Sequence, residues 1–348
     1  MNNTLFPYKW YLQNGYPERN IKRHNLKVFG TFICGGGSSM GYKLAGYQHL
    51  GGVELDASIA EVYKKNHNPK YIFVEDIRAF NKRNDLPDEL YHLDILDGSP
   101  PCSTFSMCGQ REKAWGKQKH FKEGQVLQRL DDLVFVYIDT IKKLKPKVAI
   151  LENVKGIILG NAMAYAKEIL KSLNIIGYDV QVFLLNAASM GIPQKRERVF
   201  FICRRKDMEL PKLNLKFNAP PVLFNQIIDR RDEVVTLTEY QKMLWDKRCK
   251  TDKSFGDIID RTEHRLSMFS NPIIHSDDVA PTLTSGAGVN ALYDLPRSLN
   301  KKELCEIGSY PVDYDFGNVK PEYLIGMSVP PAMIANIAYQ IAMQCFNI

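Results

Sequence analysis

The chain has 348 residues, 45% of them hydrophobic, and carries a formal net charge of +7. This length predicts one large domain and a smaller one, and no apolar run approaches the roughly 18 residues that a membrane span needs. The seven cysteines form no CxxC pair and have no clustered histidines beside them, which argues against a disulfide framework and a zinc site. The positive charge is compatible with a polyanionic partner.

The first predicted strand, at residues 26–34, runs into glycines at 35–37 and then into a segment of helical character at 40–45. A strand, a glycine loop and a helix in this order let backbone N–H groups approach a ligand closely. The loop is not a P-loop, because no Lys-Ser or Lys-Thr follows it, and Met40 occupies the last position of the GxGxxG pattern. A tight turn without a ligand is the alternative.

Acidic residues follow the next two predicted strands. Glu54 ends the second strand, at a distance from the glycine loop that suits an acid accepting hydrogen bonds from ribose hydroxyls. The alternative is that Glu54 or Asp56 only caps the helix at 57–66. The third strand, at 71–74, is followed by Asp76, which suits an adenine amino group. Together these turns predict a crevice for an adenosine-type cofactor.

An apolar run at 93–97 predicts a fourth buried strand, which Gly98 and two prolines end abruptly. Because proline fixes φ and restricts the preceding residue, Pro100 and Pro101 form a stiff connection into Cys102. Chemistry in an open parallel sheet lies just beyond the carboxyl ends of the strands, so the Cys102 thiol is a candidate nucleophile. A buried structural cysteine is the alternative.

Residues 103–127 show no good apolar period and exceed the usual loop length of roughly 12–15 residues. Long loops of this kind are commonly lids over a site. Its five basic residues suit a lid that closes over phosphates; they are Arg111, Lys113, Lys117, Lys119 and Lys122. A solvated, disordered loop is the alternative.

After an amphipathic helix at 127–144, a fifth strand at 148–151 ends at Glu152, on the sheet edge where the candidate nucleophile lies. The pattern then predicts a helix at 162–173 and strands at 178–185 and 199–203. Arg196 and Arg198 precede the last strand and point to the same side if the chain is extended there. Surface charges entering a strand are the alternative.

From residue 204 the pattern changes. Residues 204–285 have mixed charge and several prolines without a strand–helix repeat, which predicts a second, smaller domain. The chain ends in an apolar helix at 330–348 with a period near 3.6 residues, and we expect this helix to pack against the large domain.

These motifs occur in the order and spacing that are typical of one family. The sequence resembles the DNA (cytosine-5-)-methyltransferases over about residues 26–203 and 278–345. The most specific elements are Pro-Pro-Cys at 100–102, Glu-Asn-Val at 152–154 and Gln-Lys-Arg-Glu-Arg at 194–198. The resemblance implies an α/β fold: an open, mostly parallel S-adenosylmethionine-dependent methyltransferase (Rossmann-like) sheet with a second, smaller target recognition domain. The implied parts are an N-terminal arm at 1–25, a catalytic and cofactor-binding domain at 26–203, a target recognition domain at 204–277 and a return segment at 278–348.

The resemblance also implies a reaction: the methyl group of S-adenosylmethionine goes to carbon 5 of a cytosine flipped out of a specific double-stranded DNA sequence. Cys102 would attack carbon 6 of the ring, and Glu152 would hold or protonate ring nitrogen 3. Arg198 would bind the base carbonyl, with Arg196 in support. The implied cofactor residues are Phe32, Gly35, Gly36, Gly37, Glu54, Leu55, Asp76, Ile77, Gly98, Pro100, Ser328 and Val329. The implied DNA-binding residues are Ser103, Arg111, Lys113, Lys117 and Lys119; no metal is implied.

The chain departs from the family pattern at three positions. Cys34, Ser103 and Met327 stand where glycine, glutamine and asparagine are common. None of these removes a catalytic group, so we expect an active enzyme.

The expected partners are double-stranded DNA and a cognate restriction endonuclease that acts separately. We expect a monomer that contacts no membrane and works in the cytoplasm. Three alternatives stay open: the same reaction on RNA, such as a tRNA cytosine; a catalytically silent DNA-binding relative; and a nicotinamide dehydrogenase. The last is disfavoured because the GxGxxG pattern is broken.

Overall fold

The computed structural model describes residues 5–17, 21, 23–101, 133–160, 162–230, 235–267, 271–286 and 290–348. The chain forms two compact units. The sheet unit comprises Asn20–Asn186, Glu197–Lys216 and Ile334–Ile348, and the second unit comprises Met1–Arg19, Ala187–Arg196 and Phe217–Met333.

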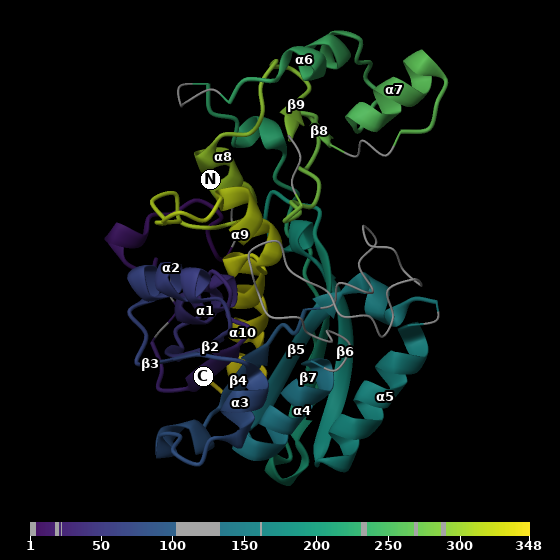
Figure 1. The fold of residues 1–348 in the computed structure, drawn as a ribbon. Helices are drawn as coiled ribbons and strands as arrows, with labels where there is room; N and C mark the ends of the chain where they lie inside the picture. Colours follow the sequence, from purple (N-terminus) through teal and green to yellow (C-terminus); the bar gives the residue numbers. More distant parts are fainter. Residues whose placement is uncertain are drawn as a thin grey trace. The chain divides into compact units, whose positions relative to one another are not determined.

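The sheet unit is built on a seven-stranded sheet (Figure 1). Its strands are β1 (Lys27–Thr31), β2 (Gln48–Glu54), β3 (Tyr71–Val74), β4 (Ile95–Gly98), β5 (Val148–Val154), β6 (Tyr178–Asn186) and β7 (Glu197–Arg205). They lie in the order β3-β2-β1-β4-β5-β7-β6, and β7 runs antiparallel to both of its neighbours. The predicted open, mostly parallel sheet is confirmed. The strand order reverses between β1 and β4, which is where open α/β sheets bind their ligands.

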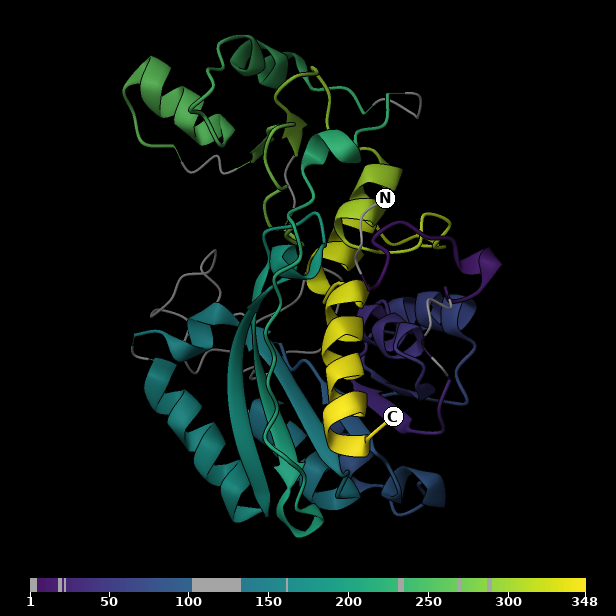
Figure 2. The same cartoon turned by 180° about the vertical axis from the view of Figure 1, so that it is seen from behind.

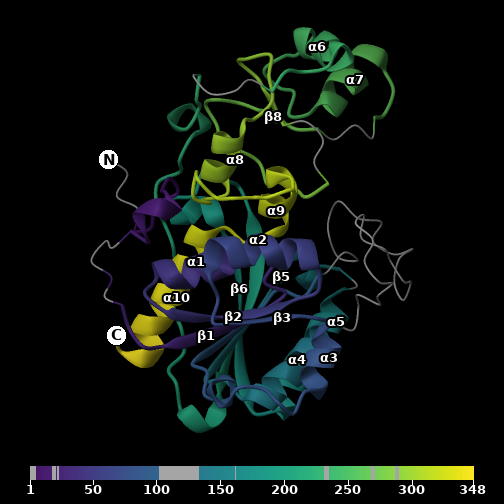
Figure 3. The ribbon, with the colours of Figure 1, turned by 60° about the vertical axis from the view of Figure 1, so that its left-hand side comes forward.

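Helices cover both faces of this sheet. They are α1 (Gly37–Leu44), α2 (Ala57–His67), α3 (Ile77–Lys82), α4 (Leu133–Leu144), α5 (Ala162–Ile175) and α10 (Pro331–Phe346). Figure 3 shows α1 and α2 on one face and α3, α4 and α5 on the other. Figure 2 shows α10 running beside α1, and the Tyr47 hydroxyl, just after α1, donates to the Ala338 carbonyl of α10 at 2.8 Å.

The core of the sheet unit follows from its apolar strands. Phe29 of β1 stacks on Phe80 of α3, with ring centroids 5.8 Å apart. The hydroxyl of Tyr137, on α4, lies 2.9 Å from the Leu96 carbonyl and 2.8 Å from the Ile150 carbonyl. Because buried hydroxyls need partners, this bonding allows a tyrosine to pack beneath the centre of the sheet.

Several strands differ from their predicted bounds, and two of these differences have a clear structural reason. β1 ends at Thr31 and not at Cys34, because Phe32 and Cys34 have φ values of 55° and 47°, which no strand accommodates. β5 continues past Glu152, because its antiparallel partner β7 pairs with it as far as Val154.

Residues 321–346 contain an 18-residue window that is apolar enough for a membrane span. In the structure, 83% of that 18-residue window is buried inside the fold. Such burial is typical of a core helix, and it agrees with the expectation that the final helix packs against the rest of the chain.

The second unit holds short elements. They are α6 (Glu239–Asp246), α7 (Phe255–Glu263), β8 (Ile273–Ile274), β9 (Ala291–Leu292), α8 (Lys301–Ile307) and α9 (Pro321–Met327). A small core joins α6, α7 and the two strands, with Trp245 and Phe255 among its members. The N-terminal arm packs in this unit through Trp10, whose indole nitrogen donates to the Ser309 carbonyl at 3.0 Å.

A buried ion pair organises the segment before α8. Arg297 and Glu303 are joined by two bonds of 2.7 and 2.8 Å, and their side chains are 6% and 0% exposed. Glu303 also accepts from the backbone N–H groups of Asp229 and Asn300. One carboxylate therefore connects the segment around the start of α8 to Asp229, which lies 74 residues earlier in the chain.

We predict that Glu303→Ala lowers the free energy of unfolding by about 3–5 kcal/mol, because it leaves the Arg297 charge buried without its partner. Urea unfolding followed by circular dichroism measures this. The control is Asp246→Ala, which breaks the exposed Lys242–Asp246 pair and should cost less than about 1 kcal/mol. Equal losses for the two variants would contradict the prediction.

Candidate active site

Two buried side chains of opposite charge meet at one edge of the sheet. The Nε atom of Arg198, on β7, lies 3.0 Å from Oε1 of Glu152, on β5, and the side chains are 15% and 9% exposed. Arg198 is opposite Val154 in the antiparallel register, so it lies on the same face as Glu152. Burial lowers the pKa of Arg198 and Glu152 opposes that shift; the guanidinium stays charged.

The residue after Glu152 connects this pair to β4. Nδ2 of Asn153 donates to the carbonyl of Pro100 at 3.3 Å, and β4 pairs with β5 up to Gly98. The structure therefore places the end of β4 directly beside the Glu152 strand. The expected nucleophile Cys102 and the expected DNA-binding residues lie outside the described residues, and their roles stay predictions; the latter are Ser103, Arg111, Lys113, Lys117 and Lys119.

The loop after β1 has left-handed backbone at three alternate residues. The φ values are 55° at Phe32, 47° at Cys34 and 72° at Gly36. A Cβ at Gly36 would lie 2.2 Å from Nε2 of His67, so only glycine fits there. Left-handed non-glycine residues cost energy and cluster at functional sites. The loop leads directly into α1, which begins at Gly37.

Glu54 ends β2 and faces this loop. Its two carboxylate oxygens accept from the N–H groups of Cys34 at 2.9 Å and Asp56 at 3.0 Å. Burial raises the pKa of Glu54, and these hydrogen bonds oppose the shift. Asp56, and not Glu54, caps α2, by accepting from the N–H groups of Ser58 and Ile59. Since a carboxylate has about four acceptor positions, Glu54 retains capacity for ligand hydroxyls.

Other expected cofactor residues also lie in the sheet unit. Asp76 caps α3 by accepting from the Arg78 N–H at 2.7 Å, and its side chain is 31% exposed. Gly98 has a packing role, because a Cβ there would lie 2.4 Å from the Tyr137 ring. Gly35, Ile77 and Pro100 are buried, and Leu55 is half-buried.

Arg196 has a different environment from Arg198. It belongs to the second unit and is 1% exposed. Its Nη1 donates to the Leu283 carbonyl at 2.8 Å, and its Nη2 donates to the carbonyls of Gly326 at 2.9 Å and Ser328 at 2.8 Å. These contacts give Arg196 a structural role just before β7, which begins at Glu197. The expectation that Arg196 also supports Arg198 in binding the base stays a prediction.

Ser328 and Val329 connect α9 and α10 within the second unit. The Ser328 hydroxyl accepts from the Tyr310 hydroxyl at 2.7 Å and lies 2.8 Å from the Leu324 carbonyl. Val329 is 4% exposed. These contacts fix the turn between the two helices, and the expected cofactor role of both residues stays a prediction.

Asp97 is a buried acid that the sequence analysis missed. It precedes Gly98 at the end of β4 and is 4% exposed. The Tyr42 hydroxyl, on α1, donates to its Oδ1 at 2.9 Å. Burial raises its pKa to about 7. The signal that identifies it is an acid inside an otherwise apolar strand run, since such groups are rarely buried without a reason.

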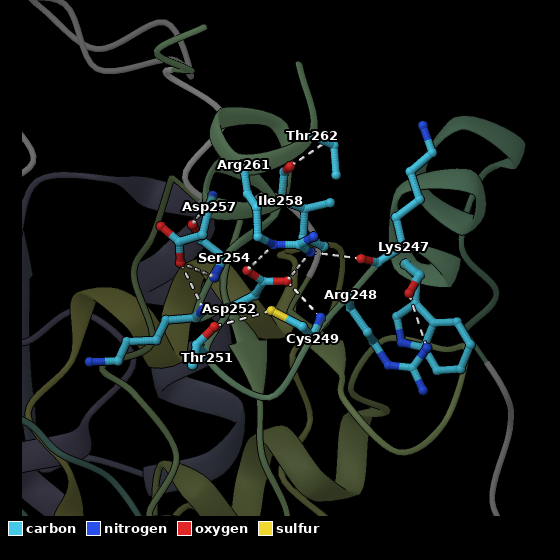
Figure 4. Close-up of polar contacts among 12 residues, drawn as sticks. Lys247, Arg248, Cys249, Thr251, Asp252, Ser254, Asp257, Ile258, Arg261 and Thr262 are labelled. Carbon is cyan, nitrogen blue, oxygen red and sulfur yellow. Dashed lines mark hydrogen bonds and ion pairs between the residues drawn. The ribbon is translucent and has the colours of Figure 1, made fainter. Parts of the chain in front are cut away.

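The loop between α6 and α7, within the expected recognition region 204–277, is held by side chains (Figure 4). Nη2 of Arg261 lies 2.7 Å from Oδ2 of Asp252 and donates to the Lys247 carbonyl at 2.7 Å. Asp252 also accepts from the Cys249 N–H at 2.7 Å. The Lys247 side chain extends away from this network (Figure 4), so the loop presents it on a fixed backbone.

The neighbouring Arg248 is packed instead of free. Its guanidinium carbon lies 3.2 Å from the centroid of the Trp245 ring, and its Nε donates to the Tyr293 carbonyl at 2.6 Å. Stacking and hydrogen bonding together give Arg248 a structural role. The charged run at 247–250 therefore contains residues with different functions.

Comparisons with known proteins extend over nearly the whole chain. The family model described as C-5 cytosine-specific DNA methylase matches residues 26–343. The type II methyltransferase M.NgoPII of Neisseria gonorrhoeae is 27% identical over 91% of this chain and 94% of its own length. The type II methyltransferase M.AplI of Arthrospira platensis is 28% identical over 100% of this chain and 94% of its own length.

Among solved structures, a DNMT2 variant of Spodoptera frugiperda superimposes with a TM-score of 0.63 at 17% identity, covering 91% of this chain and 99% of its own. This likeness concerns the fold. The family match confirms the resemblance inferred from the motifs, together with the cofactor that it implies. The chain belongs to the C-5 cytosine-specific DNA methylases, which transfer the methyl group of S-adenosylmethionine to carbon 5 of cytosine in DNA.

Proposed function

We propose that this chain methylates a cytosine flipped out of a specific double-stranded DNA sequence, through a covalent adduct with Cys102. The observation that carries this proposal is the buried Glu152–Arg198 pair beside the end of β4, which Asn153 binds through the Pro100 carbonyl. Cys102 is two residues beyond Pro100, and two residues span at most about 7 Å. A base bound against Glu152 is therefore within reach of the Cys102 thiolate.

The proposed chemistry uses each charged group once. The Cys102 thiolate adds to carbon 6, while Glu152 donates a proton or a hydrogen bond to nitrogen 3, so that electron density builds at carbon 5. Arg198 binds the base carbonyl with its fixed charge, which also favours the thiolate. S-adenosylmethionine supplies the methyl group to carbon 5. Transfer of the carbon 5 proton to solvent water then breaks the bond from carbon 6 to sulfur, which releases the Cys102 thiolate and restores the aromatic ring.

The residues present fit this cofactor. Glu54 retains acceptor positions for ribose hydroxyls beside a loop whose backbone is bent by three left-handed residues. Asp76, part-exposed at the start of α3, is available to an adenine amino group. Glu54 ends β2 and Asp76 follows β3, so both lie at the carboxyl ends of strands on the β1 side of the point where the strand order reverses. Because Gly36 has no side chain, the loop packs closely against His67, and its backbone can approach the ligand.

We assign target recognition to the region 204–277 and closure over the flipped base to the predicted lid at 103–127. The named relatives are type II methyltransferases, and we propose that this chain likewise belongs to a restriction–modification pair, with the endonuclease acting separately. We propose a monomer acting in the cytoplasm. The described cysteines are free thiols, as that compartment favours.

We predict that labelled S-adenosylmethionine and unmethylated duplex DNA yield 5-methylcytosine with the wild type and none with Cys102→Ala. Cytosine replaced by 5-fluorocytosine should leave a denaturant-resistant protein–DNA adduct, because no carbon 5 proton is available to leave. Cys249→Ala is the control, since this part-exposed free thiol should be dispensable. Label on RNA instead of DNA would favour the RNA alternative, and full activity of Cys102→Ala would refute the nucleophile.

We predict that Glu152→Gln lowers kcat by about 10²–10⁴-fold, the range typical for loss of a proton-transfer group. Binding of S-adenosylmethionine should change little, because Glu152 has no assigned contact with it. Single-turnover methylation and calorimetric binding measure the two effects. The control is Glu197→Gln, whose carboxylate forms a part-exposed pair with Lys155; a similar kcat loss there would argue against a specific role for Glu152.

We predict that Lys247→Ala weakens DNA binding and reduces the slope of log K against log salt by about one, as loss of a phosphate contact should. Fluorescence anisotropy on duplex DNA between low and moderate salt measures the slope. Lys142→Ala, an exposed lysine of α4, is the control. If the Lys247 variant keeps the wild-type slope, this loop does not contact the backbone of DNA.

A further inference from the structure

Asp97 lies at the point of the sheet where a ligand is expected. It is on β4 and pairs with Gly30 of β1, so it sits at the reversal of strand order between these strands. Its side chain accepts from the Tyr42 hydroxyl at 2.9 Å and from the Ser38 hydroxyl, both on α1. Since Ser38 follows the glycine loop directly, the Asp97 carboxyl supports the first turn of α1 from below.

The groups that hydrogen-bond to this carboxyl or interact with it electrostatically come from four elements. They are Ser38 and Tyr42 on α1, Tyr63 on α2, Tyr137 on α4 and Glu152 on β5. In the described part of the chain, none of these groups is a cation. Burying a carboxylate without a counterion is costly, and burial accordingly raises the pKa of Asp97 to about 7. Near neutral pH, a nearby charge can therefore change the ionisation of this carboxyl.

We propose that Asp97 is a positioning residue for the cofactor, which holds the first turn of α1 and supplies a buried negative charge that favours the sulfonium of S-adenosylmethionine over the neutral thioether of S-adenosylhomocysteine. This rests on the proposal that the cofactor binds at the glycine loop. Substrate and product share the same adenosine and amino-acid groups, so the sulfonium is the charge that distinguishes them. The Asp97 carboxylate therefore makes the affinity for the product, S-adenosylhomocysteine, lower than the affinity for S-adenosylmethionine.

A linkage follows from this arrangement. A bound cation stabilises the ionised carboxyl, so binding of S-adenosylmethionine drives a proton off Asp97, whereas S-adenosylhomocysteine does not. Near pH 7 the release should be a measurable fraction of a proton per cofactor bound, because part of the free protein carries that proton. The Tyr42 hydroxyl also stabilises the ionised form of Asp97, so its removal should raise the pKa of this carboxyl.

The test is calorimetric titration of the DNA-free protein with S-adenosylmethionine and with S-adenosylhomocysteine, in two buffers of different ionisation enthalpy. We expect proton release with the first ligand only, and none with either ligand for Asp97→Asn. Asp97→Asn should weaken the binding of S-adenosylmethionine by about tenfold, which corresponds to about 1.4 kcal/mol. The same variant should weaken the binding of S-adenosylhomocysteine by less than about twofold. Tyr42→Phe should move the maximum of proton release to higher pH.

The matched control is Asp94→Asn. Asp94 is also buried, but it precedes β4 at the opposite end and is paired with Lys147 at 2.7 Å. This variant should keep the wild-type proton release and the wild-type ratio of the two affinities. If Asp97→Asn retains both of these properties, Asp97 has only a structural role. A wild type that binds neither ligand would instead overturn the proposed cofactor site itself.

Discussion

The active site depends on how β5 is paired on its two sides. β4 runs parallel to β5 and β7 runs antiparallel, so the carboxyl ends of β4 and β5 meet the amino end of β7 at one edge. The register places Asp97 opposite Ile150 and Arg198 opposite Val154. Ile150 lies two residues before Glu152 on β5, and Val154 lies two residues after it. Because side chains two residues apart share a face, the sheet itself aligns three charged groups without any help from loops.

Burial of acids at this edge is compensated in three different ways. Glu54 receives peptide N–H groups, which are permanent parts of its own turn. Glu152 receives the charge of Arg198, which a bound base can also engage. Asp97 receives only hydroxyl groups among the described residues. The three acids therefore differ in the kind of group that compensates their burial, and the separate roles proposed for them above rest on this difference.

The sequence predicted much of this arrangement because parallel sheets leave a strong pattern. Buried strands read as apolar runs, and acids and prolines end them, so the sequence positions of Glu152 and Glu54 were enough to place both at the ends of their strands. The left-handed residues Phe32 and Cys34 were not, since a strand-like composition continued through them. Asp97 was missed for a related reason: its partners on α1 and β5 are fixed by tertiary packing, and no local spacing reports them.

In the Gln-Lys-Arg-Glu-Arg segment, a spacing of two residues does not give two arginines the same surroundings. Nε2 of Gln194 donates to the Ile307 carbonyl, Arg196 donates to three carbonyls around α9, and only Arg198 enters β7 and meets Glu152. The division between the two units falls after Arg196. Identical residue types at alternate positions thus serve different units, because the extended backbone that would align them begins one residue too late. Arginine suits both environments, since its planar fork satisfies several carbonyls as well as one carboxylate, and residue type alone therefore could not separate the arginine that binds carbonyls from the one that pairs with Glu152.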